Sequence, residues 1–315
     1  MDCQASHWED HKDYCQVLVR RRELGVALYV ASRDGEEQKV PLLVSLGAEV
    51  GYKLEEQPNL GYFPLLTASF QGQEKVVRAL LKAGAKPNQR GGQYSCSALF
   101  AAAQNNFPRI ACILLAGGAD INLANYQGGT PLYIACYNNK LDVVKLLVRA
   151  RGINVNQCHE GGWSPLLIAS HEGHAEVVSV LLEAVNIDVN LATSDGSTPL
   201  YIACQANSLD VVKLLVRARG INVNQCMEDG FSPLHIASQE GHAEVVSVLL
   251  TAGSDVHLKT DEGDTALVAA IYFKHTAVMA LLLAHIAKQE GAEAADKAEV
   301  GAVLSVLVSE VEVEE

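Results

Sequence analysis

The sequence predicts an all-α protein built from stacked helix pairs. One motif recurs at a spacing of 33 or 34 residues, apolar residues within each copy follow helical periodicity, and glycine or asparagine separates two apolar stretches in most copies. Self-similarity at such a spacing is typical of a solenoid, in which each unit buries its apolar face against its neighbours. We therefore expect a solenoid of about eight helix-turn-helix units joined by short β-hairpin fingers.

The repeated motif opens with a hydroxyl residue, proline and leucine. Four regular copies start at Thr130, Ser164, Thr198 and Ser232, each 34 residues after the last. Less regular copies start at Val26, Phe63, Ser97 and Thr265. The hydroxyl is expected to cap the first helix of the unit, and a proline in the first turn loses no hydrogen bond because the N–H there has no partner in the helix.

Each unit continues with a turn and a second helix. In the copy that starts at Thr130, Leu132, Ile134 and Ala135 should face inward, and the range 143–147 carries an apolar stripe at helical spacing. Nine residues after the hydroxyl position the chain must reverse, and glycine and asparagine tolerate the left-handed backbone that a reversal needs. These turn residues are Gly35, Gly72, Asn106, Asn139, Gly173, Asn207 and Gly241, with Lys274 in the last copy.

These motifs identify a resemblance to ankyrin-repeat proteins. The T-P-L-x-x-A pattern and the G-H-x-E-V-V-x-x-L-L run at 173–182 both match that family, and the match covers 24–288. The resemblance implies an ankyrin-repeat solenoid that acts as a non-enzymatic protein-protein interaction scaffold. It would bind its partner through a concave surface of fingers and inner helices. Outside it we expect a lead-in helix within 1–23 and an acidic capping helix and tail at 289–315.

The N-terminus carries a possible zinc-binding pattern. Cys3, His11 and Cys15 follow a C-x7-H-x3-C spacing, and cysteine and histidine so arranged suit tetrahedral zinc. The segment 3–15 resembles the second half of a MYND-type zinc finger. That resemblance implies Cys3, His11 and Cys15 as metal ligands, divided between two zinc ions. Each ion would lack ligands, because a closed structural site needs four. The segment is therefore interpreted either as part of a finger whose upstream half is missing, giving a zinc-dependent MYND-ankyrin adaptor, or as a relic that binds no metal.

Charge and composition restrict the class of partner and the compartment. The formal net charge is −13, which argues against a nucleic acid or an anionic membrane as the main partner. The first 25 residues lack the apolar stretch of a secretory signal, so the eight cysteines are expected to be reduced thiols in the cytoplasm or nucleus. The oligomeric state is left open.

No catalytic motif stands out. The chain has no C-x-x-C pair, no glycine-rich phosphate loop and no serine nucleophile elbow. His171 and His174 stand at positions i and i+3 across a turn, whereas the zinc-binding helix of metalloproteases has its histidines at i and i+4. His174 and His242 occupy equivalent positions and are expected to form structural hydrogen bonds. We therefore expect no enzyme activity.

Two near copies within the chain indicate where a partner binds. Residues 130–163 and 198–231 are identical at 28 of 34 positions, and the six differences fall near the ends of first helices or in fingers. Such positions either drift without constraint or form a binding surface. Aromatic residues at these positions favour the binding surface, because they bury much area at a low entropic cost. The candidate protein-binding residues are Tyr94, Tyr126, Tyr137, Trp163, His171, Phe231, Glu240 and Tyr272.

The charges suggest the character of the partner. Acidic residues occupy finger and turn positions, mainly in the C-terminal half of the chain, and favour a basic segment as the ligand. They are Glu160, Glu172, Asp195, Glu228, Asp229, Glu240, Asp261, Glu262 and Asp264. Lysines and arginines repeat on and after the second helices, where they are interpreted as a solvated face.

Overall fold

The computed structural model describes residues 3–54 and 61–290, with side chains from residue 16 to residue 289. The described residues form eight helix pairs and one 3-10 turn, η1 (Glu160–Gly162). The first helices of the pairs are α1 (Cys3–Asp34), α3 (Pro64–Phe70), α5 (Ala98–Gln104), α7 (Pro131–Tyr137), α9 (Pro165–His171), α11 (Pro199–Gln205), α13 (Pro233–Gln239) and α15 (Ala266–Tyr272). The second helices are α2 (Lys39–Ser45), α4 (Glu74–Lys82), α6 (Pro108–Ala116), α8 (Leu141–Val148), α10 (Ala175–Leu182), α12 (Leu209–Leu215), α14 (Ala243–Thr251) and α16 (Thr276–Glu290).

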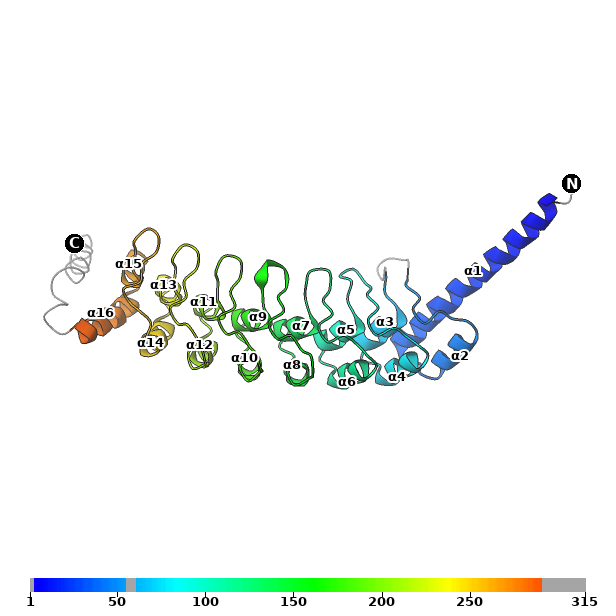
Figure 1. Ribbon diagram of the computed structural model, residues 1–315, viewed down its shortest axis with the longest axis horizontal. Helices are drawn as coiled ribbons and strands as arrows, with labels where there is room; N and C mark the ends of the chain where they lie inside the picture. Colours follow the sequence, from blue (N-terminus) through cyan, green and yellow to red (C-terminus); the bar gives the residue numbers. More distant parts are fainter. Residues whose placement is uncertain (1–2, 55–60, 291–315) are drawn as a thin grey trace, which may run out of the picture. The chain divides into compact units, whose positions relative to one another are not determined.

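The chain divides into two compact units, residues 1–160 and 161–315. In unit 1 the first helices α1, α3, α5 and α7 pack side by side in chain order, and the second helices α2, α4, α6 and α8 form a parallel row (Figure 1). Unit 2 repeats this arrangement with α9, α11, α13 and α15 in one row and α10, α12, α14 and α16 in the other. The all-α repeat fold predicted from the periodicity is confirmed.

Hydroxyl side chains start the first helices as the sequence predicts. In the six pairs from α5 to α15, the Ser or Thr Oγ accepts a hydrogen bond from the backbone N–H three residues later. The N–H donor to Thr130 is that of Tyr133, at 3.0 Å. Phe63 stands at the same position before α3 without a side-chain cap, and its ring is fully buried instead. α1 runs unbroken past Val26, so this irregular copy contains no helix start there.

The turns between paired helices have the left-handed backbone expected of them. All seven predicted glycines and asparagines have positive φ, as does Lys274 at 61°. Ser95, which replaces the glycine found in other fingers, also has a positive φ of 53°. Serine therefore adopts a conformation at this finger that costs a residue with a Cβ atom about 1–2 kcal/mol.

The core of each unit lies between its two rows of helices. Leu132 and Ala135 of α7 are fully buried, as are Val143, Val144 and Leu147 of α8. The same positions are buried in the other regular repeats, so each helix pair presents one packing pattern to its neighbours. Ile134, which we expected to face inward, is instead partly exposed at the surface of the first-helix row.

Asparagine side chains join successive repeats outside the core. In unit 1, Asn122 donates from Nδ2 to the carbonyl of Gly152 at 2.7 Å and accepts at Oδ1 from the N–H of Asn154 at 2.9 Å. Asn88 in the preceding repeat bonds in the same way, and so does Asn190 in unit 2. These bonds pair backbone groups of the loops that follow the second helices.

The fingers between helix pairs are tight loops rather than strand pairs. Over the described residues they contain one isolated antiparallel bridge, between Gly91 and Cys96, and no strand. Two backbone bonds typically close the tip, for example from the N–H of Thr260 to the carbonyl of Asp264 and from the N–H of Gly263 to the carbonyl of Thr260, both at 2.9 Å. The expected β-hairpins are thus too short to form ladders. The expected C-terminal capping helix lies largely at 291–315, outside the described residues.

Candidate protein-binding site

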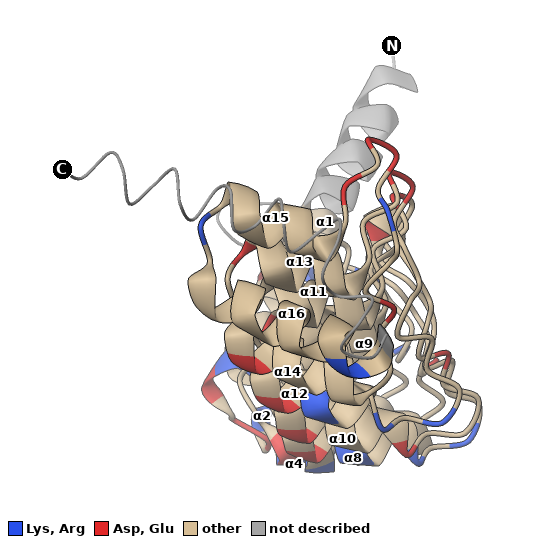
Figure 2. Cartoon of the chain, turned by 90° about the vertical axis from the view of Figure 1, so that its left-hand side faces the viewer, with Lys and Arg blue, Asp and Glu red and all other residues tan. Residues whose placement is uncertain are grey.

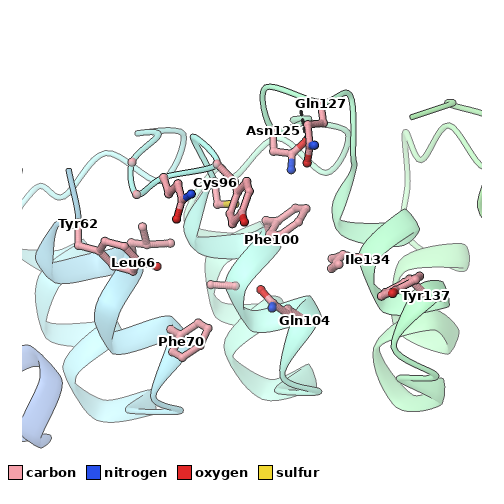
Figure 3. A pocket seen from close by; sticks show the side chains of 15 residues that line it. Tyr62, Leu66, Phe70, Cys96, Phe100, Gln104, Asn125, Gln127, Ile134 and Tyr137 are labelled. Atoms are coloured by element: carbon pink, nitrogen blue, oxygen red, sulfur yellow. Dashed lines mark hydrogen bonds between the residues drawn. The ribbon is translucent and has the colours of Figure 1, made fainter. Parts of the chain in front are cut away.

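Unit 1 contains a groove of about 620 Å³ on the exposed side of its first-helix row (Figure 3). Three helices and the fingers above them form its walls. Figure 3 shows residues of α3, α5 and α7 on one side and finger residues on the other. The lining residues are Tyr62, Leu66, Phe70, Gly91, Gly92, Gln93, Tyr94, Cys96, Phe100, Ala101, Gln104, Asn125, Gln127, Ile134 and Tyr137.

The helix register explains which side chains reach the groove. Phe70, Gln104 and Tyr137 are the last residues of α3, α5 and α7, at the same position of successive repeats. Phe70 is 39% exposed and Tyr137 is 47% exposed. The repeat period therefore places one side chain of each helix end along a single row, and two of the three are large exposed aromatic rings.

The hollow itself follows from a small residue at one repeat position. Ala101 lies four residues after the capping serine of α5, and four other repeats have isoleucine there: Ile134, Ile168, Ile202 and Ile236. Ala101 lines the groove. A side chain with three fewer carbon atoms than isoleucine leaves space between the neighbouring helix ends, which deepens the surface at this repeat.

The finger wall of the groove is held by local hydrogen bonds. Asn125 Oδ1 accepts from the N–H groups of Gln127 and Gly129, at 3.0 and 2.8 Å, and so fixes the turn of its finger. The N–H of Tyr126 donates to the carbonyl of Tyr94 in the preceding finger at 3.2 Å. The two tyrosine rings stack with their centroids 5.9 Å apart. The predicted residues Tyr94 and Tyr126 thus contact each other, and Tyr94 lines the groove.

The groove is electrically neutral. Among the described residues that line it there is no Lys, Arg, Asp, Glu or His. Burial raises the pKa of the Cys96 thiol to about 11, although a hydrogen bond with Asn125 acts in the opposite direction. Burial likewise raises the pKa of Tyr62. Both groups are therefore protonated and uncharged at neutral pH.

Unit 2 carries the remaining predicted aromatic residues as separate pairs. The ring of Trp163 packs edge-on against His171, with centroids 5.5 Å apart, and His171 Nδ1 lies 3.0 Å from the Glu172 carboxylate. Phe231 lies beside the buried His235. Tyr272 is 78% exposed. These side chains are at least partly accessible to a partner, and their ring contacts pair them locally within separate repeats.

Acidic side chains gather around Tyr201 on the finger side of unit 2. The pKa of the Tyr201 phenol is raised to about 12, mainly by burial and also by the nearby carboxylates of Asp229, Asp195 and Glu240. All three carboxylates are on exposed residues. In the part of unit 2 that the structure describes, no ion pair joins them to a basic side chain. Figure 2 shows acidic segments at finger tips and charges of both signs on the row of second helices.

Sequence reasoning missed much of the groove lining, including Tyr62, Phe70, Phe100 and Gln104. Phe70 could have been found, because it shares the helix-end position of Tyr137 and Tyr272. Phe100 shares the position of Tyr133 and Tyr201 in regular repeats, so an aromatic ring there gives no distinctive signal.

The predicted zinc ligands lie at the N-terminal end of the described chain. Cys3, His11 and Cys15 lie on α1, but their side chains are outside the described residues. Elsewhere in the described chain no three His, Cys, Asp or Glu residues are grouped to hold a metal ion.

None of the described helices is long and apolar enough to cross a membrane. His242 Nε2 lies 3.3 Å from the carbonyl of Gln205 in the preceding repeat, the structural role predicted for it.

Comparisons with known proteins agree with the helix-pair architecture. The family model described as ankyrin repeats (3 copies) matches residues 99–193, 149–227, 184–260 and 234–310, and the model described as ankyrin repeat matches residues 60–92. The crystal structure of the human ASB11 ankyrin repeat domain is similar, with a TM-score of 0.59 and 28% sequence identity, covering 71% of this chain and 98% of that chain. No curated protein matches the chain. Since the family matches extend over more than half of the chain, it belongs to the ankyrin-repeat family, whose repeats serve as protein-protein interaction scaffolds.

Proposed function

We propose that this scaffold binds a basic segment of a partner protein on the finger side of unit 2, without catalysing a reaction. The observation that carries the proposal is the group of exposed carboxylates of Asp195, Asp229 and Glu240, none of which is paired with a basic residue of the described unit. A Lys or Arg side chain of a partner would supply the missing counter-charge. Complementary charge gives an interface its specificity and speeds association.

Local hydrogen bonds support this role by fixing the carboxylates. Asp195 accepts from the hydroxyl of Thr193 and from the N–H of Ser197, and the Thr193 bond is the main cause that lowers its pKa. The N–H of Phe231 donates to Asp229 at 3.3 Å. Acceptors that are already ordered lose little side-chain entropy when a cation binds, which favours affinity.

The internal duplication of the chain supports the same assignment. The positions equivalent to Asp195 and Asp229 two repeats earlier hold Gln127 and Gly161, while the apolar core residues of the two copies are identical. The acidic residue Asp229 thus distinguishes the second copy from the first, and Asp195 stands three residues before that copy begins. Neither carboxylate is required by the fold.

A peptide selection tests the proposal. A display library of random linear peptides would be selected on the full chain and on a triple variant, Asp195→Asn, Asp229→Asn and Glu240→Gln. We expect Lys- and Arg-rich peptides to be enriched on the wild type and lost from the variant, with affinity that falls as salt screens the charges.

The matched control removes three charges elsewhere. Asp210→Asn, Glu176→Gln and Glu244→Gln make the same change of net charge on exposed positions of α12, α10 and α14. This variant should retain the basic peptides. The proposal would be contradicted if the basic peptides still bound the Asp195, Asp229 and Glu240 triple variant. It would also be contradicted if both triple variants lost these peptides equally.

A zinc-dependent adaptor is the alternative function, and it rests on the N-terminal resemblance alone. The ligands it needs would be supplied by Cys3, His11 and Cys15 together with a segment that precedes them. Zinc stoichiometry of an N-terminally extended chain tests it, and a chain that binds no zinc rejects it. An intracellular location is also proposed, supported by the free thiols of the described cysteines.

A further inference from the structure

We propose that the groove of unit 1 is a second docking site, which takes an uncharged segment with apolar or aromatic side chains from a partner protein. The site is independent of the acidic surface of unit 2, because the groove lining lies wholly within unit 1. Its volume, about 620 Å³, lies within the range typical of ligand pockets.

The chemistry of the walls selects an uncharged occupant. A Lys, Arg, Asp or Glu side chain buried here would lose water and find no counter-charge among the described lining residues, which is costly. Phe70, Tyr94 and Tyr137 are each more than one-third exposed. Covering them with apolar side chains removes that surface from water, which is the main favourable term in most associations.

The amides on the walls suit a peptide rather than a nucleic acid. The side chains of Gln93, Gln104 and Gln127 line the groove and form no hydrogen bond with any described residue. Each can therefore donate to, and accept from, the backbone of an extended segment. Aromatic rings can also stack on bases, but grooves for single-stranded nucleic acid combine such rings with positive charge, and no basic side chain is among the described residues that line this one.

Ala101 provides a substitution that fills the groove with a residue the fold already accepts. Isoleucine occupies the equivalent position of four other repeats, so Ala101→Ile should fold while it occupies the hollow between α3, α5 and α7. A second variant, Tyr137→Gln, introduces the residue of the near copy, Gln205, and removes one exposed ring without filling the groove.

The experiment selects a display library of random linear peptides on the full chain, and then measures the affinity of the recovered peptides for each variant. We expect a class of peptides rich in Leu, Phe, Tyr or Trp and free of charge at the contacting positions. Both Ala101→Ile and Tyr137→Gln should weaken this class by about tenfold or more, the change typical of an interface anchor. Its affinity should change little with salt.

Three results would overturn the assignment. One is that no recovered peptide is weakened by Ala101→Ile while that variant keeps the helical circular dichroism and melting temperature of the wild type. Another is that the groove-dependent peptides are basic. The third is that a single-stranded oligonucleotide binds and is displaced by Ala101→Ile. If Ala101→Ile is less stable than the wild type, the test rests on peptide binding by Tyr137→Gln. Tyr137 lies at the exposed end of α7, so this substitution should leave the fold intact.

The acidic triple variant of unit 2 separates this inference from the proposed function. Peptides that use the groove should bind that variant and the wild type equally, whereas basic peptides should bind the Ala101→Ile variant normally. If no groove-dependent peptide is found, the groove site is rejected and the acidic site of unit 2 is unaffected. If no basic peptide depends on the carboxylates, the acidic site is rejected and the groove site is unaffected.

Discussion

At the residue scale, Ser95 shows how one side chain can strain an otherwise regular repeat. Its φ of 53° lies in the left-handed region, whereas the corresponding turn of the next finger uses Gly128, with φ 83°. We expect Ser95→Gly to raise the free energy of unfolding by about 1 kcal/mol, because the strain of a Cβ atom in this conformation is relieved. Equilibrium urea denaturation would measure it. The matched control is Gly128→Ser in the neighbouring finger, which should lower stability by a similar amount, and an unchanged midpoint in both variants would contradict the argument.

His235 is a residue whose protonation state matters for the fold. Burial lowers its pKa from the ordinary 6.5. Its Nδ1 accepts from the N–H of Ser232 at 3.2 Å, and Nε2 donates to the carbonyl of Asp264 at 3.1 Å, so the folded chain uses the neutral ring. Protonation would remove the Nδ1 acceptor of the Ser232 N–H, which is one half of the capping box at the start of α13. The stability from the neutral ring is therefore complete above pH 6.5 and is lost as the pH falls below it toward the lower pKa of the folded state.

The substitution His235→Leu tests this pH dependence, because Leu167 occupies the equivalent position of an earlier repeat and is fully buried. Melting temperatures would be measured for both proteins between about pH 7.5 and 5, a range that spans the reference pKa of histidine. We expect the wild type to lose more stability than the variant over this range. All other histidines are common to the two proteins, so parallel curves would exclude His235 as a source of acid sensitivity.

At the scale of elements, asparagines add hydrogen bonds between helix pairs that already pack through their apolar faces. Asn122→Ala removes two hydrogen bonds to the next repeat, with Gly152 and Asn154, and we expect it to cost about 1–3 kcal/mol of unfolding free energy. Asn122→Asp keeps the acceptor and loses the donor, so its cost should be intermediate. Chemical denaturation followed by circular dichroism would measure both, and a cost near zero for Asn122→Ala would show that water replaces these bonds.

The sequence was sufficient to predict the helix pairs, their caps and their turns, because each depends on residues close together in the chain. Thr130, for example, caps α7 through an N–H only three residues away. The groove was only partly predictable. Tyr94 and Tyr137 were expected at a surface, but the role of Ala101 depends on what neighbouring helices leave open, and a small residue gives no positive signal of a cavity. The hydrogen bonds of Asn122 were likewise missed, because their partners lie about 30 residues further along the chain.

At the scale of the whole molecule, stacked repeats should unfold locally, because each helix pair packs against its neighbours in the row. Leu114 of α6 and Leu249 of α14 are both fully buried, one in each unit. Replacing either by alanine should cost about 2–5 kcal/mol. We expect Leu114→Ala to speed amide hydrogen exchange most in α4, α6 and α8, and Leu249→Ala to do so in α12, α14 and α16, since local openings draw on local stability. Mass spectrometry of the exchanged peptides would measure the exchange rate of each helix. Equally faster exchange across both units would contradict local unfolding and would mean that the chain unfolds as one cooperative body. A partner bound to one unit would then also stabilise the other.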